Sequence, residues 1–192
     1  MAHIKSFISI LEQKFGLSAE AKKAFVEALS FRKFKKKELL FSSGQVSSQI
    51  YFIISGCVTE FFVSPKNEEI SVWFGFENDF AVPLSSFISQ SPSITSIVAM
   101  EPTSVIEINR NKLYELYDDF HEIERIGRQI TEQYFLETEL YHYEFHHLQA
   151  QQRFENLLKA KPHTFNRIPL SMIASYLGIS NETLSRLRAK RL

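Results

Sequence analysis

The C-terminal stretch, residues 169–192, constrains this chain most, because its pattern is that of two short helices joined by a tight turn. Apolar residues at helical spacing run up to Leu177. Gly178 follows, at the point where a helix commonly ends on a left-handed residue that glycine adopts at little cost. Ser180 stands where the side chain of a helix N-cap accepts a backbone N–H. The pattern predicts a helix-turn-helix, with the second helix over residues 181–191.

The outer face of this second helix carries groups that pair with base edges: arginine with guanine, glutamate with cytosine and asparagine with adenine. Basic residues crowd its last turns. The same spacing also fits a helical hairpin that only packs on a larger body, but the base-pairing groups and the basic turns favour a helix that enters the major groove of DNA. The residues expected to contact DNA are Ser180, Asn181, Glu182, Thr183, Ser185, Arg186 and Lys190.

The net charge of zero conceals a marked asymmetry along the chain. Residues 149–192 carry a net charge of +6, whereas residues 101–148 carry −7. A basic end beside an acidic segment is typical of a DNA-reading module attached to a carrier.

The period of the sequence changes near residue 31 from helical to strand-like. Short runs rich in β-branched and aromatic residues are separated by turn signals, which predicts an antiparallel β-barrel of the jelly-roll type with flanking helices, in the α+β class. The basic run within residues 32–37 would also suit a nucleic-acid patch. We interpret it as the solvent side of an edge hairpin, where lysine discourages pairing between sheet edges.

Helical spacing covers residues 4–29 and returns over residues 109–158. Ile123, Ile126 and Ile130 begin an apolar seam in the second of these stretches, and we expect this seam to bury against the same helix of a second copy. The predicted division is a barrel domain over residues 1–120, a dimerisation helix over 121–147 and a helix-turn-helix domain over 148–192.

With its predicted barrel, long helix and helix-turn-helix, the sequence resembles the Crp–Fnr family of bacterial transcription regulators over nearly the whole chain. The most specific piece is IASYLGISNETLSRLR, which includes a Glu-x-x-Ser-Arg pattern like that of the Fnr branch, and the barrel segment around Gly44 and Gly56 is also similar. The resemblance implies a cyclic-nucleotide-binding-like barrel and a homodimer that reads an inverted repeat with TGA in each half-site. RNA polymerase is a further partner that it implies.

Nucleotide-sensing members of this family hold the cyclic phosphate with an arginine and the ribose with a glutamate, and our alignment places Ser93 and Pro83 at these positions. Since a buried phosphate without a cation is costly, we expect an effector other than cyclic AMP, or a barrel filled by its own side chains. An alternative function is a ligand-binding signalling module whose helical tail binds protein. The expected effector-pocket residues are Val82, Pro83, Leu84, Ser85, Ser86, Ser93, Ile94 and Thr95.

The sequence gives little support to several other kinds of protein, among them metal proteins, enzymes and membrane proteins. Cys57 is the single cysteine, which excludes an intrachain disulfide and the iron–sulfur cluster of the Fnr branch. His142 and His146 lie one helical turn apart without an evident third ligand, and they fit a half-hydrated hinge better than a metal site or a metal enzyme. We therefore expect no enzyme activity, no cofactor and no metal. The chain also lacks a membrane-length apolar run, so the expected location is the cytoplasm, away from the membrane.

Overall fold

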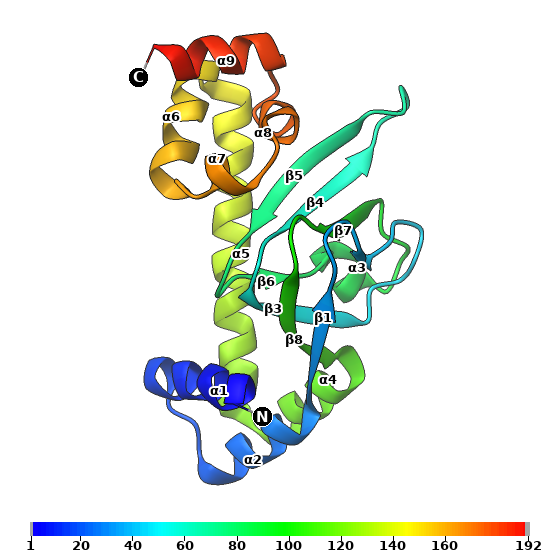
Figure 1. Ribbon diagram of the computed structural model, residues 1–192. Coiled ribbons are helices and arrows are strands. Elements are labelled where there is room, and N and C mark those ends of the chain that lie inside the picture. Colours follow the sequence, from blue (N-terminus) through cyan, green and yellow to red (C-terminus); the bar gives the residue numbers. More distant parts are fainter. Residues whose placement is uncertain (1, 191–192) are drawn as a thin grey trace.

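The structure is a computed structural model that describes residues 2–190, with only some of the side chains of the first helix (Figure 1). Two N-terminal helices, α1 (Ala2–Phe15) and α2 (Ala19–Ala28), precede the sheets. The strands and the helix among them are β1 (Leu29–Phe34), β2 (Leu39–Phe41), β3 (Gln49–Ser55), β4 (Val58–Val63), β5 (Glu69–Gly75), β6 (Phe80–Ala81), α3 (Leu84–Ser89), β7 (Thr95–Ala99) and β8 (Thr103–Asn109). The remaining helices are α4 (Arg110–Asp119), α5 (His121–His147), α6 (Ala150–Ala160), α7 (Thr164–Arg167), α8 (Leu170–Tyr176) and α9 (Asn181–Ala189).

The strands form two four-stranded antiparallel sheets, with the orders β1-β8-β3-β6 and β2-β7-β4-β5. Their facing sides enclose one apolar core, to which Phe34, Ile53 and Val105 contribute from the first sheet and Val58 and Ile97 from the second. The expectation of antiparallel sheets with flanking helices is confirmed. The expected closed barrel is not, because the described strands pair only within their own sheet.

The run that we expected to form one edge hairpin is divided between the sheets. β1 pairs with β8 and β2 pairs with β7, so the two strands lie at edges of different sheets and do not pair with each other. Lys37 lies between them with a positive φ of 69° and donates its backbone N–H to Ala99 O at 2.7 Å. The basic residues thus follow an edge, as expected, but they do not form a hairpin.

A second core lies on the outer side of the first sheet, under α1, α2, α4 and α5. Phe7 of α1, Phe25 of α2 and Leu113 of α4 are buried there against the sheet residues Phe52 and Ile106. This packing explains why the amphipathic N-terminal segment is helical and why it docks where it does.

The long helix α5 connects the two ends of the molecule, as Figure 1 shows. Its first turns pack against α4 and its far end reaches the C-terminal helices. Gly127 permits the close approach of α4, since a Cβ there would overlap the hydroxyl of Tyr117. A third core joins the sheets to the C-terminal helices, through Phe74 and Met100 on one side and Ile173 and Leu184 on the other.

Candidate functional site

The turn between α8 and α9 has the geometry that its sequence predicts. Gly178 has a positive φ of 64°. Its N–H donates to Ser175 O and the N–H of Ile179 donates to Ala174 O, both at 3.0 Å, which closes the end of α8 in a Schellman motif. Ser180 then caps α9, because its hydroxyl oxygen accepts the N–H of Thr183 at 3.1 Å.

One side of α9 is held firmly against α8. Leu184 is fully buried and packs with Ile173, Ala174 and Leu177 in the third core. The opposite side is free of such contacts and faces solvent. Its exposed members are Asn181, Glu182, Ser185, Arg186, Ala189 and Lys190.

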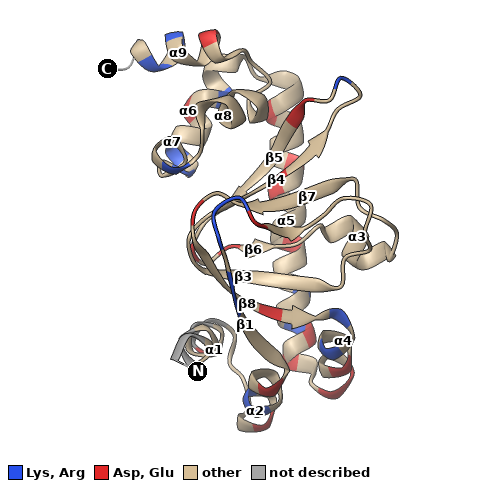
Figure 2. Cartoon of the chain, turned by 45° about the vertical axis from the view of Figure 1, so that its right-hand side comes forward, with Lys and Arg blue, Asp and Glu red and all other residues tan. Residues whose placement is uncertain are grey.

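Two charged residues on this outer side orient each other. Arg186 Nη2 lies 3.3 Å from Glu182 Oε1, one turn apart, and their side chains are 68% and 81% exposed. An ion pair this exposed contributes little to stability, so its main consequence is the direction in which it holds the guanidinium. Figure 2 shows these charges on α9 at the end of the molecule.

The other predicted DNA contacts lie on the same helix or at its ends. Thr183 is half-buried, and its hydroxyl lies 3.0 Å from that of Ser180, so it serves the cap. Lys190 is the exposed C-cap residue of α9. The predicted helix extends to residue 191, which lies outside the described residues.

An arginine between two carboxylates joins the C-terminal helices to the sheets. Arg167 of α7 donates two hydrogen bonds to Glu77, each of 2.8 Å, and two to Glu101, of 2.6 and 3.4 Å. Glu77 also accepts the N–H of Gly56. The hydrogen bonds from Arg167 lower the pKa of Glu77 to about 2, which keeps the pair ionised at neutral pH.

Two further contacts reinforce this junction. Ser175 of α8 accepts the backbone N–H of Ser71 on β5 at 3.0 Å. Lys161 Nζ donates to Phe74 O at 2.8 Å and lies 3.4 Å from Asp79. These contacts hold α7 and α8 against the sheets, and α9 packs on α8 through Leu184.

The predicted effector residues do not form one pocket. Ser86 is buried, donates to Ser91 O at 2.6 Å and accepts the N–H of Ser47, so its hydroxyl is already satisfied. Ser93 bonds the backbone and hydroxyl of Thr95, whereas Ile94 is 80% exposed. Ser85 is exposed and Pro83 is buried.

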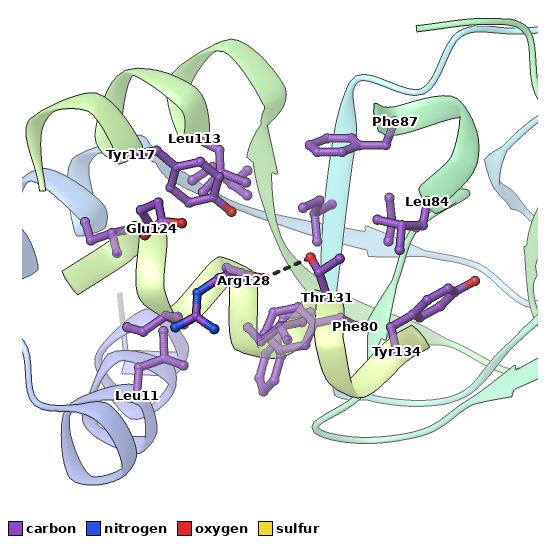
Figure 3. A pocket seen from close by; sticks show the side chains of 18 of the residues that line it. Leu11, Phe80, Leu84, Phe87, Leu113, Tyr117, Glu124, Arg128, Thr131 and Tyr134 are labelled. Atoms are coloured by element: carbon purple, nitrogen blue, oxygen red, sulfur yellow. Dashed lines mark hydrogen bonds between the residues drawn. The ribbon is translucent and has the colours of Figure 1, made fainter. Parts of the chain in front are cut away.

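Val82 and Leu84 do line a cavity, of about 840 Å³, between the first sheet and helices α1, α3, α4 and α5. Figure 3 shows the side chains of Phe80, Phe87 and Tyr117 around it, with the Thr131 hydroxyl bonded to Gly127 O at 2.9 Å. Its wall is almost entirely apolar, and charged side chains such as Arg128 stand on α5 at its rim.

A second cavity, of about 890 Å³, lies where β4 and β5 meet α5, α6 and α8. Glu60 of β4 faces it although this residue is only 6% exposed, and it accepts a hydrogen bond of 2.6 Å from Thr95. Burial raises the pKa of Glu60 to about 7, against the opposing effect of the Thr95 hydrogen bond. Our sequence reasoning missed Glu60. A glutamate among apolar strand residues was the available signal.

The predicted seam on α5 needs correction. Ile123 and Ile126 are 1% and 3% exposed within the single chain, because they pack into its own second core. Ile130 is half-buried against the same cluster. The chain itself therefore covers Ile123 and Ile126, and it covers Ile130 in part. The apolar residues of α5 that do reach solvent are Phe135, Leu136, Leu140, Tyr143 and Phe145.

The histidine pair lies as its spacing predicts, with the ring centroids of His142 and His146 4.4 Å apart. Within the described residues, no three His, Cys, Asp or Glu side chains gather as metal ligands would. Cys57 is a free, buried thiol. Of the helices that the structure describes, none is both long enough and apolar enough to cross a membrane.

Comparison with known proteins agrees with this architecture. Residues 31–120 match the family described as the cyclic nucleotide-binding domain. The transcriptional activator protein Anr of Pseudomonas protegens is 28% identical over 166 residues, which cover 81% of this chain and 67% of Anr. The structure of FixK2 from Bradyrhizobium japonicum has a TM-score of 0.73 at 17% identity, over 84% of this chain and 83% of that chain. A structure from Eubacterium rectale, titled as a regulator of the Crp/Fnr family, has a TM-score of 0.71 at 17% identity, over 94% and 85%.

The paired sheets with their helices thus define a cyclic-nucleotide-binding-like fold. The sequence similarity to Anr and the likeness in fold to the two solved structures agree with this fold. Anr is described as a transcriptional activator, and the Eubacterium rectale structure is titled as a transcriptional regulator.

Proposed function

We propose that the chain is a homodimeric DNA-binding regulator that reads an inverted-repeat operator with α9. The observation that carries this proposal is the Glu182–Arg186 pair on the outer side of a helix whose other side is buried. The proposal includes the division into a sensor domain over residues 1–120, a dimerisation helix over 121–147 and a DNA-binding domain over 148–192. RNA polymerase remains a predicted partner.

The outer side of α9 suggests which bases it reads. Arg186 has the fork geometry to meet guanine O6 and N7, while Glu182 can accept from the N4 amino group of cytosine. Ser185 is short enough for close contact with a base, and Asn181 can reach a further base or a phosphate. By resemblance to the Fnr branch, we expect TGA in each half-site, with half-site centres roughly 34 Å apart.

We propose that the dimer seam lies on the solvent-facing stripe of α5. Leu136, Leu140 and Tyr143 follow one another at intervals of four and three residues, which is the spacing of a coiled-coil seam. The exposed fractions of the three side chains are 62%, 58% and 56%, so the single chain leaves them in water. A second α5 would cover them.

The alternative of a protein-binding tail is less well supported. Protein interfaces concentrate their binding energy in buried aromatic and aliphatic anchors. Within the described part of the chain, the exposed side of α9 offers polar and charged groups with Ala189 as its one apolar member. Such a surface suits base edges and phosphates better than an apolar groove.

Arg186→Ala should lower affinity for the cognate operator by about 1–3 kcal/mol and relax the preference at the guanine. The physical reason is the loss of a bidentate contact to one base. The measurement is fluorescence anisotropy with an operator selected from random DNA and with a scrambled duplex of the same length.

Lys190→Ala is the matched variant, because Lys190 is an exposed cation at the end of the same helix. It should weaken binding to both duplexes alike. The slope of log affinity against log salt concentration should become shallower by about one. If Arg186→Ala instead lowers both affinities equally, Arg186 contacts only phosphate and the proposed readout is wrong.

Cyclic AMP and cyclic GMP should bind weakly or not at all. At the positions where we expect the phosphate and ribose partners, Ser93 is engaged with Thr95 and Pro83 offers no polar side chain. Isothermal titration calorimetry checks this, and a micromolar dissociation constant for either nucleotide would contradict it.

A further inference from the structure

The second cavity lies where the sheets meet α5 and the C-terminal helices α6 and α8. Glu60 and Trp73 line it from the sheets, Tyr134 and Tyr141 from α5, and Tyr176 from α8. Tyr176 also contacts Phe74 of β5, with ring centroids 5.0 Å apart, and accepts a hydrogen bond from Tyr141 through its backbone oxygen. A molecule in this cavity would therefore touch the sheets, α5 and the C-terminal helices together.

The deepest polar group in the wall is a carboxyl group with spare capacity. Within the described residues, Thr95 is the one hydrogen-bond partner of Glu60, and it bonds to Oε1. The Tyr134 hydroxyl stays protonated at neutral pH, since burial raises its pKa to about 12. Two more carboxylates, Glu137 and Glu144, stand on α5 at the edge of the cavity.

The cations of the wall are directed elsewhere. Arg153 donates to the backbone oxygens of Leu148 and Leu177 at 2.6 and 2.9 Å. Lys161 is held by Phe74 O and Asp79, and its ammonium lies 5.2 Å from the centroid of the Trp73 ring. Lys159 is exposed. Among the described residues, the buried end of the cavity presents a carboxyl group and aromatic rings, and the wall's Arg153 and Lys161 already have partners.

We propose that this cavity binds an organic cation, an amine carried on an apolar or aromatic body, with its ammonium group at Glu60. An ammonium group supplies the hydrogen-bond donors that Glu60 lacks, and an aromatic ring such as that of Tyr134 attracts a cation through its face. A phosphate or a carboxylate would instead meet Glu60 without compensation. An effect of this ligand on operator binding would rest on the proposed function. The binding of the ligand to the cavity does not rest on it.

Trp73 gives a direct readout, since it is the only tryptophan of the chain. The full chain is titrated with 2-phenylethylamine, and with phenylacetate and cyclic AMP as anionic counterparts, while its fluorescence and thermal unfolding are followed without DNA. The amine should cause a saturable fluorescence change and raise the unfolding temperature. The two anions should do neither.

Glu60→Gln keeps the size of the side chain and an acceptor for Thr95 but removes the charge, so it should weaken amine binding at least about ten-fold. Glu139→Gln is the control, because Glu139 is an exposed α5 residue outside this cavity, and it should leave amine binding unchanged. The proposal is overturned if the amine gives no saturable response, if an anion binds in its place, or if Glu60→Gln binds the amine as the wild type does. None of these results depends on whether α9 binds DNA.

Discussion

Replacing Ile126 by Asp is expected to unfold the second core, where α1, α2, α4 and α5 pack on the first sheet, in the single chain. Ile126 is 3% exposed and packs in the second core, where an unpaired carboxylate costs several kcal/mol. That cost is a large part of the roughly 5–15 kcal/mol that stabilises a typical domain. Urea unfolding followed by circular dichroism should show a large fall in the midpoint, or no folded protein.

Ile126→Val is the control, and it should cost only about 0.5–1.5 kcal/mol. The two changes together distinguish burial within the chain from burial between copies. A folded Ile126→Asp protein that has the wild-type unfolding midpoint and is merely monomeric would restore the seam that the sequence predicts.

Leu136→Asp is expected to separate the two copies and leave each chain folded. Leu136 is 62% exposed in the single chain, so a carboxylate costs little there. In the proposed seam, the variant would bury two opposing carboxylates, at a cost of several kcal/mol. This cost should raise the dimer dissociation constant roughly a hundred-fold or more. Light scattering at micromolar concentration should give a dimer for the wild type and a monomer for the variant.

Ile94→Asp is the matched control, because Ile94 is 80% exposed and lies in a loop away from α5. It should remain dimeric, with an unchanged melting curve. A wild-type protein that is monomeric under these conditions would argue against the homodimer, and a dimeric Leu136→Asp protein would place the seam elsewhere.

Local signals allowed the turn before α9 to be predicted from the sequence. The positive φ at Gly178 and the cap at Ser180 depend only on neighbouring residues. The isoleucine seam shows the limit of this reasoning. Helical spacing identifies an apolar face, but it does not tell whether the chain's own core or a second copy covers that face.

Contacts between residues far apart in the chain set the other limits on what the sequence could predict. β1 and β2 were expected to pair because they are adjacent in sequence, whereas their partners β8 and β7 lie far along the chain. Short elements such as α3 and β6 carry too few residues for a periodic signal. The contacts of Arg167 with Glu77 and Glu101 span 90 and 66 residues, so spacing alone does not reveal them.

Glu60 was missed for a specific reason. The pairing of β4 with β5 shifts register between Glu60 and Phe61. Such a bulge breaks the alternation of inward and outward side chains on which strand predictions depend. Four consecutive residues of β4, from Val58 to Phe61, are buried as a result.

Fluorescence anisotropy of the wild-type protein tests the central claim most directly. An inverted repeat is first selected from random DNA, and its affinity is compared with that of a scrambled duplex of equal length across a range of salt concentrations. The account predicts two chains per duplex and a preference of at least about 1,000-fold for the selected sequence. Equal affinity for both duplexes, or no binding to either at low salt, would contradict it.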